Sequence, residues 1–146
     1  MSAAVRVAFI CVQNAGRSQM ATAFAKRERE RRGLTDEVEL LTGGTDPADE
    51  IHSVVREVMT EEGFDLSGRQ PRGVTTADLE SCDYVATMGC STLELDADER
   101  AVDVRDWALE DPDGKDLDRV RETRETVRER VRGLFDEVEA EVTADV

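Results

Sequence analysis

Apolar and polar positions follow two different periods along the chain. Short, mainly apolar segments predict strands at residues 5–10, 38–41, 83–88 and 101–104, and the first of these is expected to be buried on both faces. Apolar positions spaced three and four residues apart predict helices over residues 18–32, 51–59 and 117–142. A short capped helix is expected over residues 75–80. A turn over residues 42–45, which contains two glycines, is expected after the second strand.

Strands that alternate with helices in this order predict an α/β fold. We expect three layers, with a central four-stranded parallel sheet and helices on both of its faces. The chain of 146 residues has the size of one domain, and its pattern shows no repeat, linker or low-complexity stretch. The expected organisation is therefore a single domain over residues 1–146.

Acidic residues outnumber basic residues by 34 to 19, which gives a formal net charge of −15. The phosphate backbone repels such a chain, so nucleic acid is not an expected partner. Only Lys26 and Lys115 are lysines, and an acidic, lysine-poor surface is typical of salt-rich cytoplasms, so we expect a halophilic protein. No apolar run is long enough to span a membrane and no cleavage pattern indicates secretion. The expected location is the cytoplasm, with no membrane contact.

The candidate chemistry lies in the loop after the first predicted strand. Ligands of parallel sheets bind beside the carboxyl ends of the strands, where both Cys11 and Cys90 are expected. Cys11 and Arg17 are separated by five residues, a length that can wrap backbone N–H groups around a tetrahedral oxyanion at a helix N-terminus. The expected oxyanion-binding residues are Val12, Gln13, Asn14, Ala15, Gly16, Arg17 and Ser18.

Each residue type in this loop suits that task. The planar guanidinium of Arg17 can hold two oxygens at once. The positive field favours the thiolate of Cys11, which makes Cys11 a competent nucleophile. Asn14 tolerates the unusual backbone conformation of such a loop and can brace it, Ser18 can donate to the sulfur, and Gly16 permits close approach of a ligand. The plain structural alternative is a buried cysteine that ends a strand and an arginine that starts a surface helix.

Residues 11–21, Cys-Val-Gln-Asn-Ala-Gly-Arg-Ser-Gln-Met-Ala, resemble the low-molecular-weight protein tyrosine phosphatase superfamily, and most of all its arsenate reductase branch. The resemblance extends to residues 42–45, 63–67, 85–90 and 107–115. It implies that Asp111, in an Asp-Pro pair, is the general acid for the departing oxygen, a role worth about 10²–10⁴-fold in rate. From the residues alone, an ordinary turn is the simpler interpretation of Asp111 and its neighbours.

The resemblance implies two related activities, both of which begin when Cys11 attacks a tetrahedral oxyanion. Residues 17–21 are like the reductase branch, whereas the phosphatases usually place proline after Arg-Ser. Gly16 stands where many phosphatases carry a second cysteine, and Asp113 and Gly114 stand where they have aromatic residues. We therefore expect thiol-dependent reduction of arsenate to arsenite, with hydrolysis of phosphate monoesters as the alternative. A non-catalytic module that senses oxyanions or redox state is the alternative from another class.

A reductase of this kind needs a second thiol. Cys90 is the internal candidate, although it can also be a small buried residue, and the further Cys-Pro of related reductases is absent. Cys82 precedes the third predicted strand, which places it about 26 Å from Cys90. A disulfide needs Cα atoms within about 7 Å, so Cys82 is expected to be a bystander.

An external reductant, either a thioredoxin-like protein or a low-molecular-weight thiol, is the other possibility for the second thiol. We expect no tightly bound cofactor. No metal site is expected, because His52 is the only histidine. The expected substrate is a small oxyanion, either arsenate or a phosphate ester.

Overall fold

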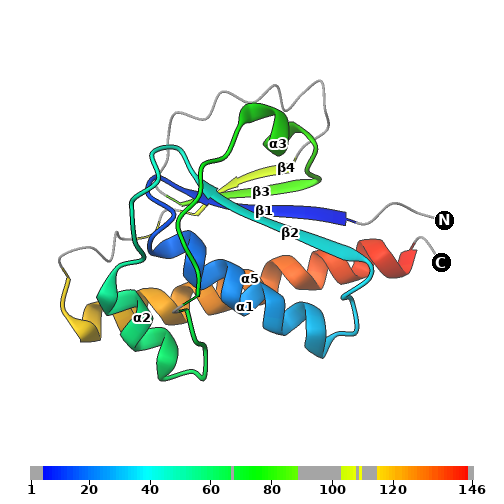
Figure 1. Ribbon diagram of the computed structural model, residues 1–146. Helices are drawn as coiled ribbons and strands as arrows, with labels where there is room; N and C mark the ends of the chain where they lie inside the picture. Colours follow the sequence, from blue (N-terminus) through cyan, green and yellow to red (C-terminus); the bar gives the residue numbers. More distant parts are fainter. Residues whose placement is uncertain (1–4, 67, 89–102, 108, 110–114, 145–146) are drawn as a thin grey trace.

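A computed structural model describes residues 5–66, 68–88, 103–107, 109 and 115–144 of the chain (Figure 1). Its centre is a four-stranded sheet in the order β2-β1-β3-β4, and every pair of neighbouring strands is parallel. The strands are β1 (Val5–Cys11), β2 (Val38–Gly44), β3 (Tyr84–Met88) and β4 (Asp103–Asp106). The parallel sheet confirms the architecture predicted from the alternation of strands and helices.

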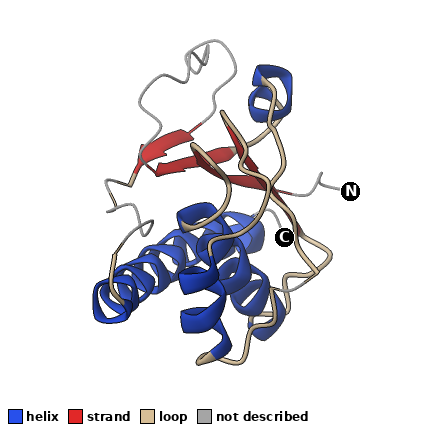
Figure 2. Cartoon of the chain, turned by 60° about the vertical axis from the view of Figure 1, so that its left-hand side comes forward, coloured by secondary structure: helices blue, strands red, loops and turns tan. Residues whose placement is uncertain are grey.

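Helices cover both faces of the sheet, but unequally (Figures 1 and 2). The helices α1 (Arg17–Arg31), α2 (Ser53–Thr60) and α5 (Leu117–Ala144) lie together on one face, where α1 and α2 both pack against α5. The other face carries the short helix α3 (Thr76–Glu80). Its predicted cap is present, because the Thr75 hydroxyl accepts from the Asp78 N–H at 3.1 Å and the Asp78 carboxylate accepts from the Thr75 N–H at 3.1 Å.

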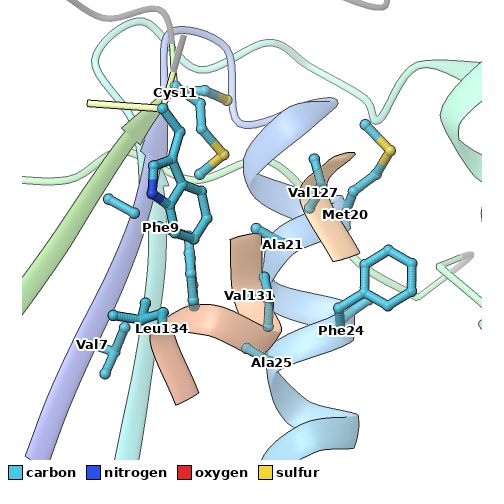
Figure 3. Close-up of a cluster of buried hydrophobic side chains, with 14 of the residues drawn as sticks. Val7, Phe9, Cys11, Met20, Ala21, Phe24, Ala25, Val127, Val131 and Leu134 are labelled. Atoms are coloured by element: carbon cyan, nitrogen blue, oxygen red, sulfur yellow. The ribbon is translucent and has the colours of Figure 1, made fainter. Parts of the chain in front are cut away.

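The core is divided by the sheet, because alternate side chains of β1 point to opposite faces. Val7, Phe9 and Cys11 belong to the larger cluster, which β1 shares with α1 and α5 (Figure 3). Ala8 and Ile10 belong to a smaller cluster beneath α3. The pattern places the Cys11 side chain at the carboxyl end of β1 on the face covered by α1.

Two local predictions need correction. Thr42 and the two following glycines are not a turn, since β2 continues through them in register with β1 as far as the pair Cys11–Gly44. The fourth strand was predicted at residues 101–104, but its described part runs through Asp106. This edge strand carries a polar pattern, because Arg105 pairs with Asp103 beside it and with Glu137 of α5 instead of entering the core. Residues 101 and 102 lie outside the described residues.

The ends of α1 and α2 follow the glycine signals in the sequence. Gly33 and Gly63 both adopt positive φ angles, of 68° and 86°, shortly after the ends of these helices. Among the described residues, no helix is both long and apolar enough to cross a membrane.

Candidate active site

The loop from Cys11 to Gly16 leads directly from β1 into α1, at the carboxyl edge of the sheet. The first turn of α1 contains no acidic residue, and residues 17–20 are all described. The positive end of the helix dipole therefore faces the loop without a neutralising carboxylate in that turn. This position is the one that the sequence predicted for an oxyanion cradle.

The sulfur of Cys11 lies between two hydrogen-bonding groups. It accepts from the backbone N–H of Asn14 at 3.2 Å and lies 2.8 Å from the hydroxyl oxygen of Ser18. That hydroxyl already accepts a hydrogen bond from the Asn14 amide at 2.7 Å, so its own proton is available to the sulfur. Two donors can thus point at one sulfur atom, and such bonds are strongest when the acceptor is anionic.

Asn14 organises the loop around that sulfur. It is fully buried and has a φ of 52°, in the left-handed region that asparagine tolerates. Its amide nitrogen donates to the hydroxyls of Ser18 and Thr42 at 2.7 and 2.8 Å. Its amide oxygen accepts from the side chain of Gln19 and the backbone N–H of Arg72, both at 3.0 Å. All four hydrogen-bonding positions of the amide are used, which matches the prediction that Asn14 braces the loop.

The segment after β2 supports the loop from outside. Backbone N–H groups of residues 45, 46, 48 and 52 donate to carbonyls of the loop, with distances between 2.8 and 3.2 Å. The four carbonyls that accept these bonds belong to Cys11, Val12, Gln13 and Ala15. These bonds fix four carbonyls of the loop from outside, and the Asn14 N–H between them points at the Cys11 sulfur at 3.2 Å.

Glycine at position 44 lets β2 approach the loop closely. A Cβ atom there would lie 2.5 Å from the carbonyl oxygen of Val12 and 2.9 Å from the backbone nitrogen of Asn14. Both of these neighbours are backbone atoms, so they cannot move aside as a side chain would.

The sequence predicted roles for the residues inside the loop but not for those that hold it from outside. The positioning residues that it missed are Gln19, Thr42, Gly44 and Arg72. Glycine within a strand was the available signal for Gly44, since such a glycine often marks a close backbone approach. No comparable signal exists for Arg72, which contributes through its backbone N–H and lies 58 positions from Asn14.

Arg17 opens α1 and is largely buried, with 8% of its surface exposed. Its guanidinium donates to the backbone carbonyl of Leu109 at 3.1 Å, so the segment that follows β4 reaches the loop. Trp107 in the same segment is buried, donates its backbone N–H to the Thr87 carbonyl at 2.7 Å, and packs against Phe9 with ring centroids 5.9 Å apart. The two other predicted catalytic residues, Asp111 and Cys90, lie outside the described residues.

Cys82 is placed far from this loop. The backbone N–H of Asp83 donates to Arg6 at the start of β1, whereas Cys11 at the end of β1 pairs with Met88. Five residues of strand between these levels correspond to about 17 Å. Cys82 is buried, its thiol donates to the Asp78 carbonyl at 3.4 Å, and burial raises the pKa of this thiol. The prediction that Cys82 is a bystander at the far edge of the sheet is consistent with this position.

The possible metal ligands among the described residues are not clustered. No group of three or more histidine, cysteine, aspartate or glutamate side chains there is arranged to hold a metal ion. His52 instead contributes its backbone N–H, which donates to the Ala15 carbonyl at 3.0 Å.

Comparison with known proteins identifies the family. The model of the low molecular weight phosphotyrosine protein phosphatase family matches residues 6–144, and the chain belongs to this family. It is 70% identical over 129 residues to "Putative arsenate reductase" of Halobacterium salinarum, an alignment that covers 88% of this chain and 89% of the relative. It is 31% identical over 132 residues to the glutaredoxin arsenate reductase of Synechocystis, with 89% of this chain and 95% of that protein covered.

A solved structure agrees with the fold. The thioredoxin-dependent arsenate reductase of Corynebacterium glutamicum superposes with a TM-score of 0.76 at 32% identity. The superposition covers 96% of this chain but 64% of that protein's chain, so the present chain corresponds to about two thirds of its length. Relatives within the family are arsenate reductases and protein tyrosine phosphatases, and the chain is likewise an enzyme.

Proposed function

We propose that this protein reduces arsenate to arsenite with Cys11 as the nucleophile. The observation that carries the proposal is the surroundings of the Cys11 sulfur, which lies 3.2 Å from the Asn14 N–H and 2.8 Å from the Ser18 hydroxyl within a loop that precedes a helix N-terminus. The name of the 70%-identical relative supports reduction over phosphate ester hydrolysis.

The first step is binding of arsenate in the loop. Backbone N–H groups of residues 12–16 and the guanidinium of Arg17 hold its oxygens, and the N-terminus of α1 stabilises its negative charge. The contact of Arg17 with the Leu109 carbonyl at 3.1 Å supports this role, because it holds a flexible side chain at the loop before substrate arrives.

The second step is attack by the Cys11 thiolate on arsenic. A sulfur–arsenic bond forms and one arsenic–oxygen bond breaks. The departing oxygen leaves as water after it receives a proton, and we assign that proton to Asp111 because of the Asp-Pro pair that contains it. Arsenic is still pentavalent at this stage, since no electrons have yet been transferred.

Reduction takes place in the third step, which needs a thiol. That thiol attacks the sulfur of Cys11, a disulfide forms, and the electron pair of the sulfur–arsenic bond goes to arsenic, which leaves as trivalent arsenite. If the attacking thiol is external, one further external thiol reduces the mixed disulfide and restores Cys11; if it is Cys90, two external thiols reduce the Cys11–Cys90 disulfide and restore both cysteines. Two thiols thus become one disulfide for each arsenate reduced, and one water is released.

The first of these thiols is either Cys90 or an external molecule. The names of two relatives, a glutaredoxin and a thioredoxin-dependent arsenate reductase, support an external protein thiol as the final reductant. We further propose that the enzyme works in a salt-rich cytoplasm. The net charge of −15 and the similarity to a Halobacterium protein support that setting.

The test is to incubate the purified protein with arsenate and either a thioredoxin system or glutathione with glutaredoxin, in concentrated potassium chloride, and to measure arsenite. We expect arsenite formation that Cys11→Ser abolishes, whereas Cys82→Ser retains it. An aryl phosphate is assayed in parallel. Phosphate release without any arsenite would identify a phosphatase instead, and unchanged turnover in Cys11→Ser would overturn the mechanism altogether.

A further inference from the structure

A second concave site lies on α1, away from the Cys11 loop. It is a cavity of about 230 Å³ between the middle of α1 and the segment that follows α2. This segment runs from the end of α2 past α1 toward α3 (Figure 1). Lys26, which lines the cavity, is about 13 Å further along the helix axis than Arg17, so the two sites are separate.

Three cationic side chains surround this cavity, namely those of Lys26, Arg27 and Arg69. In the part of the chain that the structure describes, none of the three forms an ion pair, although acidic residues outnumber basic ones by 34 to 19. Arg121 and Arg124 on α5 show the contrast, because both are paired with Glu61 at 2.7 Å. Three cations that form no ion pair with a described residue thus line one cavity, where they outnumber the two carboxylates of the lining.

The positive charges around the cavity repel one another. Lys26 is exposed but partly shielded from water, which lowers its pKa, and the positive charges of Arg69 and Arg29 lower it further. Burial also lowers the pKa of Arg69. An anion in the cavity would relieve this repulsion. Glu30 and Asp65 also line the cavity but are exposed, and they limit the charge that an incoming anion can carry.

Phe64 of the cavity lining and its neighbour Phe24 fix the position of one of the three cations. The guanidinium of Arg27 lies over the rings of Phe24 and Phe64, at 5.1 and 4.8 Å from their centres. The two rings meet edge to face with their centroids 5.4 Å apart. Arg27 is therefore positioned before any ligand arrives. Phe64 and Leu66 line the same cavity, so a ligand would contact apolar groups as well as charges.

From these features we propose that the cavity binds a small organic anion, one that carries a carboxylate or phosphate group on an aromatic or short aliphatic body. Lys26 and Arg69 bind the anionic group, and Phe64 and Leu66 contact the body. The volume lies below the usual range of drug-sized pockets, about 300–1,000 Å³, which restricts the ligand to a small molecule.

The site has a direct structural connection to the catalytic loop. Arg69 belongs to the segment that continues to Arg72, whose N–H donates to the Asn14 side chain at 3.0 Å and whose carbonyl accepts from Gly44 at 2.9 Å. A ligand that joins α1 to this segment stabilises the position of Arg72. Ligand binding should therefore stabilise the folded protein and the braced form of the loop together.

The test uses phthalate, an aromatic dicarboxylate, as the anionic probe and phthalamide as its uncharged counterpart. Each is titrated into the full chain at fixed potassium chloride, by calorimetry and by thermal unfolding. We expect saturable binding of phthalate that raises Tm, and no binding of phthalamide. Lys26→Gln should weaken phthalate binding by about tenfold, which corresponds to the loss of one charged contact. The double variant Lys26→Gln/Arg69→Gln should weaken it further.

The matched control is Arg130→Gln, which removes one positive charge from an exposed position of α5. It should bind phthalate like the original chain. Because Lys26 is exposed, Lys26→Gln should fold normally and reduce arsenate at the original rate without phthalate. The proposal is overturned if phthalate does not bind, or if it binds the double variant as tightly as the original chain, since binding would then lie elsewhere, for example in the Cys11 loop.

Discussion

The hydroxyl oxygen of Ser18 lies 2.8 Å from the sulfur of Cys11, across the junction between the loop and the first turn of α1. Asn14 fixes this geometry, because its amide donates to the same hydroxyl at 2.7 Å and leaves the hydroxyl proton for the sulfur. Ser18 is fully buried, so water does not compete for either bond. The reactivity of Cys11 should therefore depend on the Ser18 hydroxyl, which lies against the sulfur itself.

Ser18→Ala should slow arsenate reduction by about ten- to a hundredfold, because a hydrogen bond to a charged acceptor is worth about 1.5–3 kcal/mol. The same variant should slow the alkylation of Cys11 by iodoacetamide at neutral pH. Thr22→Ala is the matched control, since it removes a nearby buried hydroxyl that donates to the Ser18 carbonyl at 2.7 Å and not to the sulfur. Equal alkylation rates in Ser18→Ala and the original chain would contradict this role.

Asn14→Ala should destabilise the fold as well as the site. It leaves the Arg72 N–H and the side chains of Gln19 and Thr42 without their bonds to the Asn14 side chain, and it places alanine at a φ of 52°. We expect a loss of about 2–4 kcal/mol in the free energy of unfolding, measured by denaturant titration. Asn14→Gly separates the two causes, because glycine removes the backbone cost but not the loss of hydrogen bonds. If both variants are as stable as the original chain, the brace is unimportant.

Gly44→Ala should impair catalysis through the backbone. Its Cβ would lie 2.5 Å from the Val12 carbonyl oxygen, so the loop must shift. We expect kcat/KM for arsenate to fall by at least about tenfold, with a loss of about 1–3 kcal/mol in stability. Gly68→Ala is the control, since a Cβ there meets no atom within 4 Å. Full activity in Gly44→Ala would show that the loop tolerates the displacement.

The elements of the fold could largely be predicted because their signals are local. Residues 5–10 form a mainly apolar segment, as expected for a strand whose two faces are both covered. Gly33 and Gly63 indicate helix ends, because glycine adopts the positive φ angles found there. The spacing of Cys11 and Arg17 was equally local, and it located the loop between β1 and α1.

The parts that could not be predicted depend on contacts between distant residues. The Gly43–Gly44 pair resembles a turn until β1 and the loop are placed beside it, and only then does the lack of side chains explain the close approach. The polar strand β4 is a similar case. Its Arg105 forms an ion pair with Glu137 of α5, a contact between residues far apart in the sequence, so the strand forms without an apolar pattern. In both cases tertiary packing overrides the local preference.

The ion pairs of Glu61 should make stability depend on pH in the acidic range. Hydrogen bonds from Arg121 and Arg124 lower the pKa of Glu61 from 4.5 to about 2 in the folded protein. Because the folded pKa is the lower one, the stabilisation is present above pH 4.5 and is lost as the pH falls toward 2. We expect the Tm difference between the original chain and Glu61→Gln to shrink over this interval. Concentrated salt should reduce this Tm difference at every pH, since the ion pairs of Glu61 with Arg121 and Arg124 are partly exposed.

The control for this effect is Glu129→Gln, an exposed position of α5. It should leave Tm close to that of the original chain throughout the same pH range. A Tm difference for Glu61→Gln that stays constant from pH 7 to pH 2.5 would contradict the contribution of these ion pairs.

The cysteines outside the loop should behave differently from each other. Cys82 lies about 17 Å from Cys11 along the strands, within a small apolar cluster beneath α3. Cys82→Ala should retain the rate of arsenate reduction and lose about 1–2 kcal/mol of stability, because it deletes a buried side chain.

Cys90→Ser distinguishes the two sources of the second thiol. If Cys90 is that thiol, the variant should form arsenite only when a small thiol is added in excess, and non-reducing mass spectrometry of the original chain should find a Cys11–Cys90 disulfide. If an external thiol attacks Cys11 directly, the variant should keep its rate and a mixed disulfide on Cys11 should accumulate. Loss of activity in Cys82→Ala with unchanged folding would refute the assignment of Cys82 as a bystander.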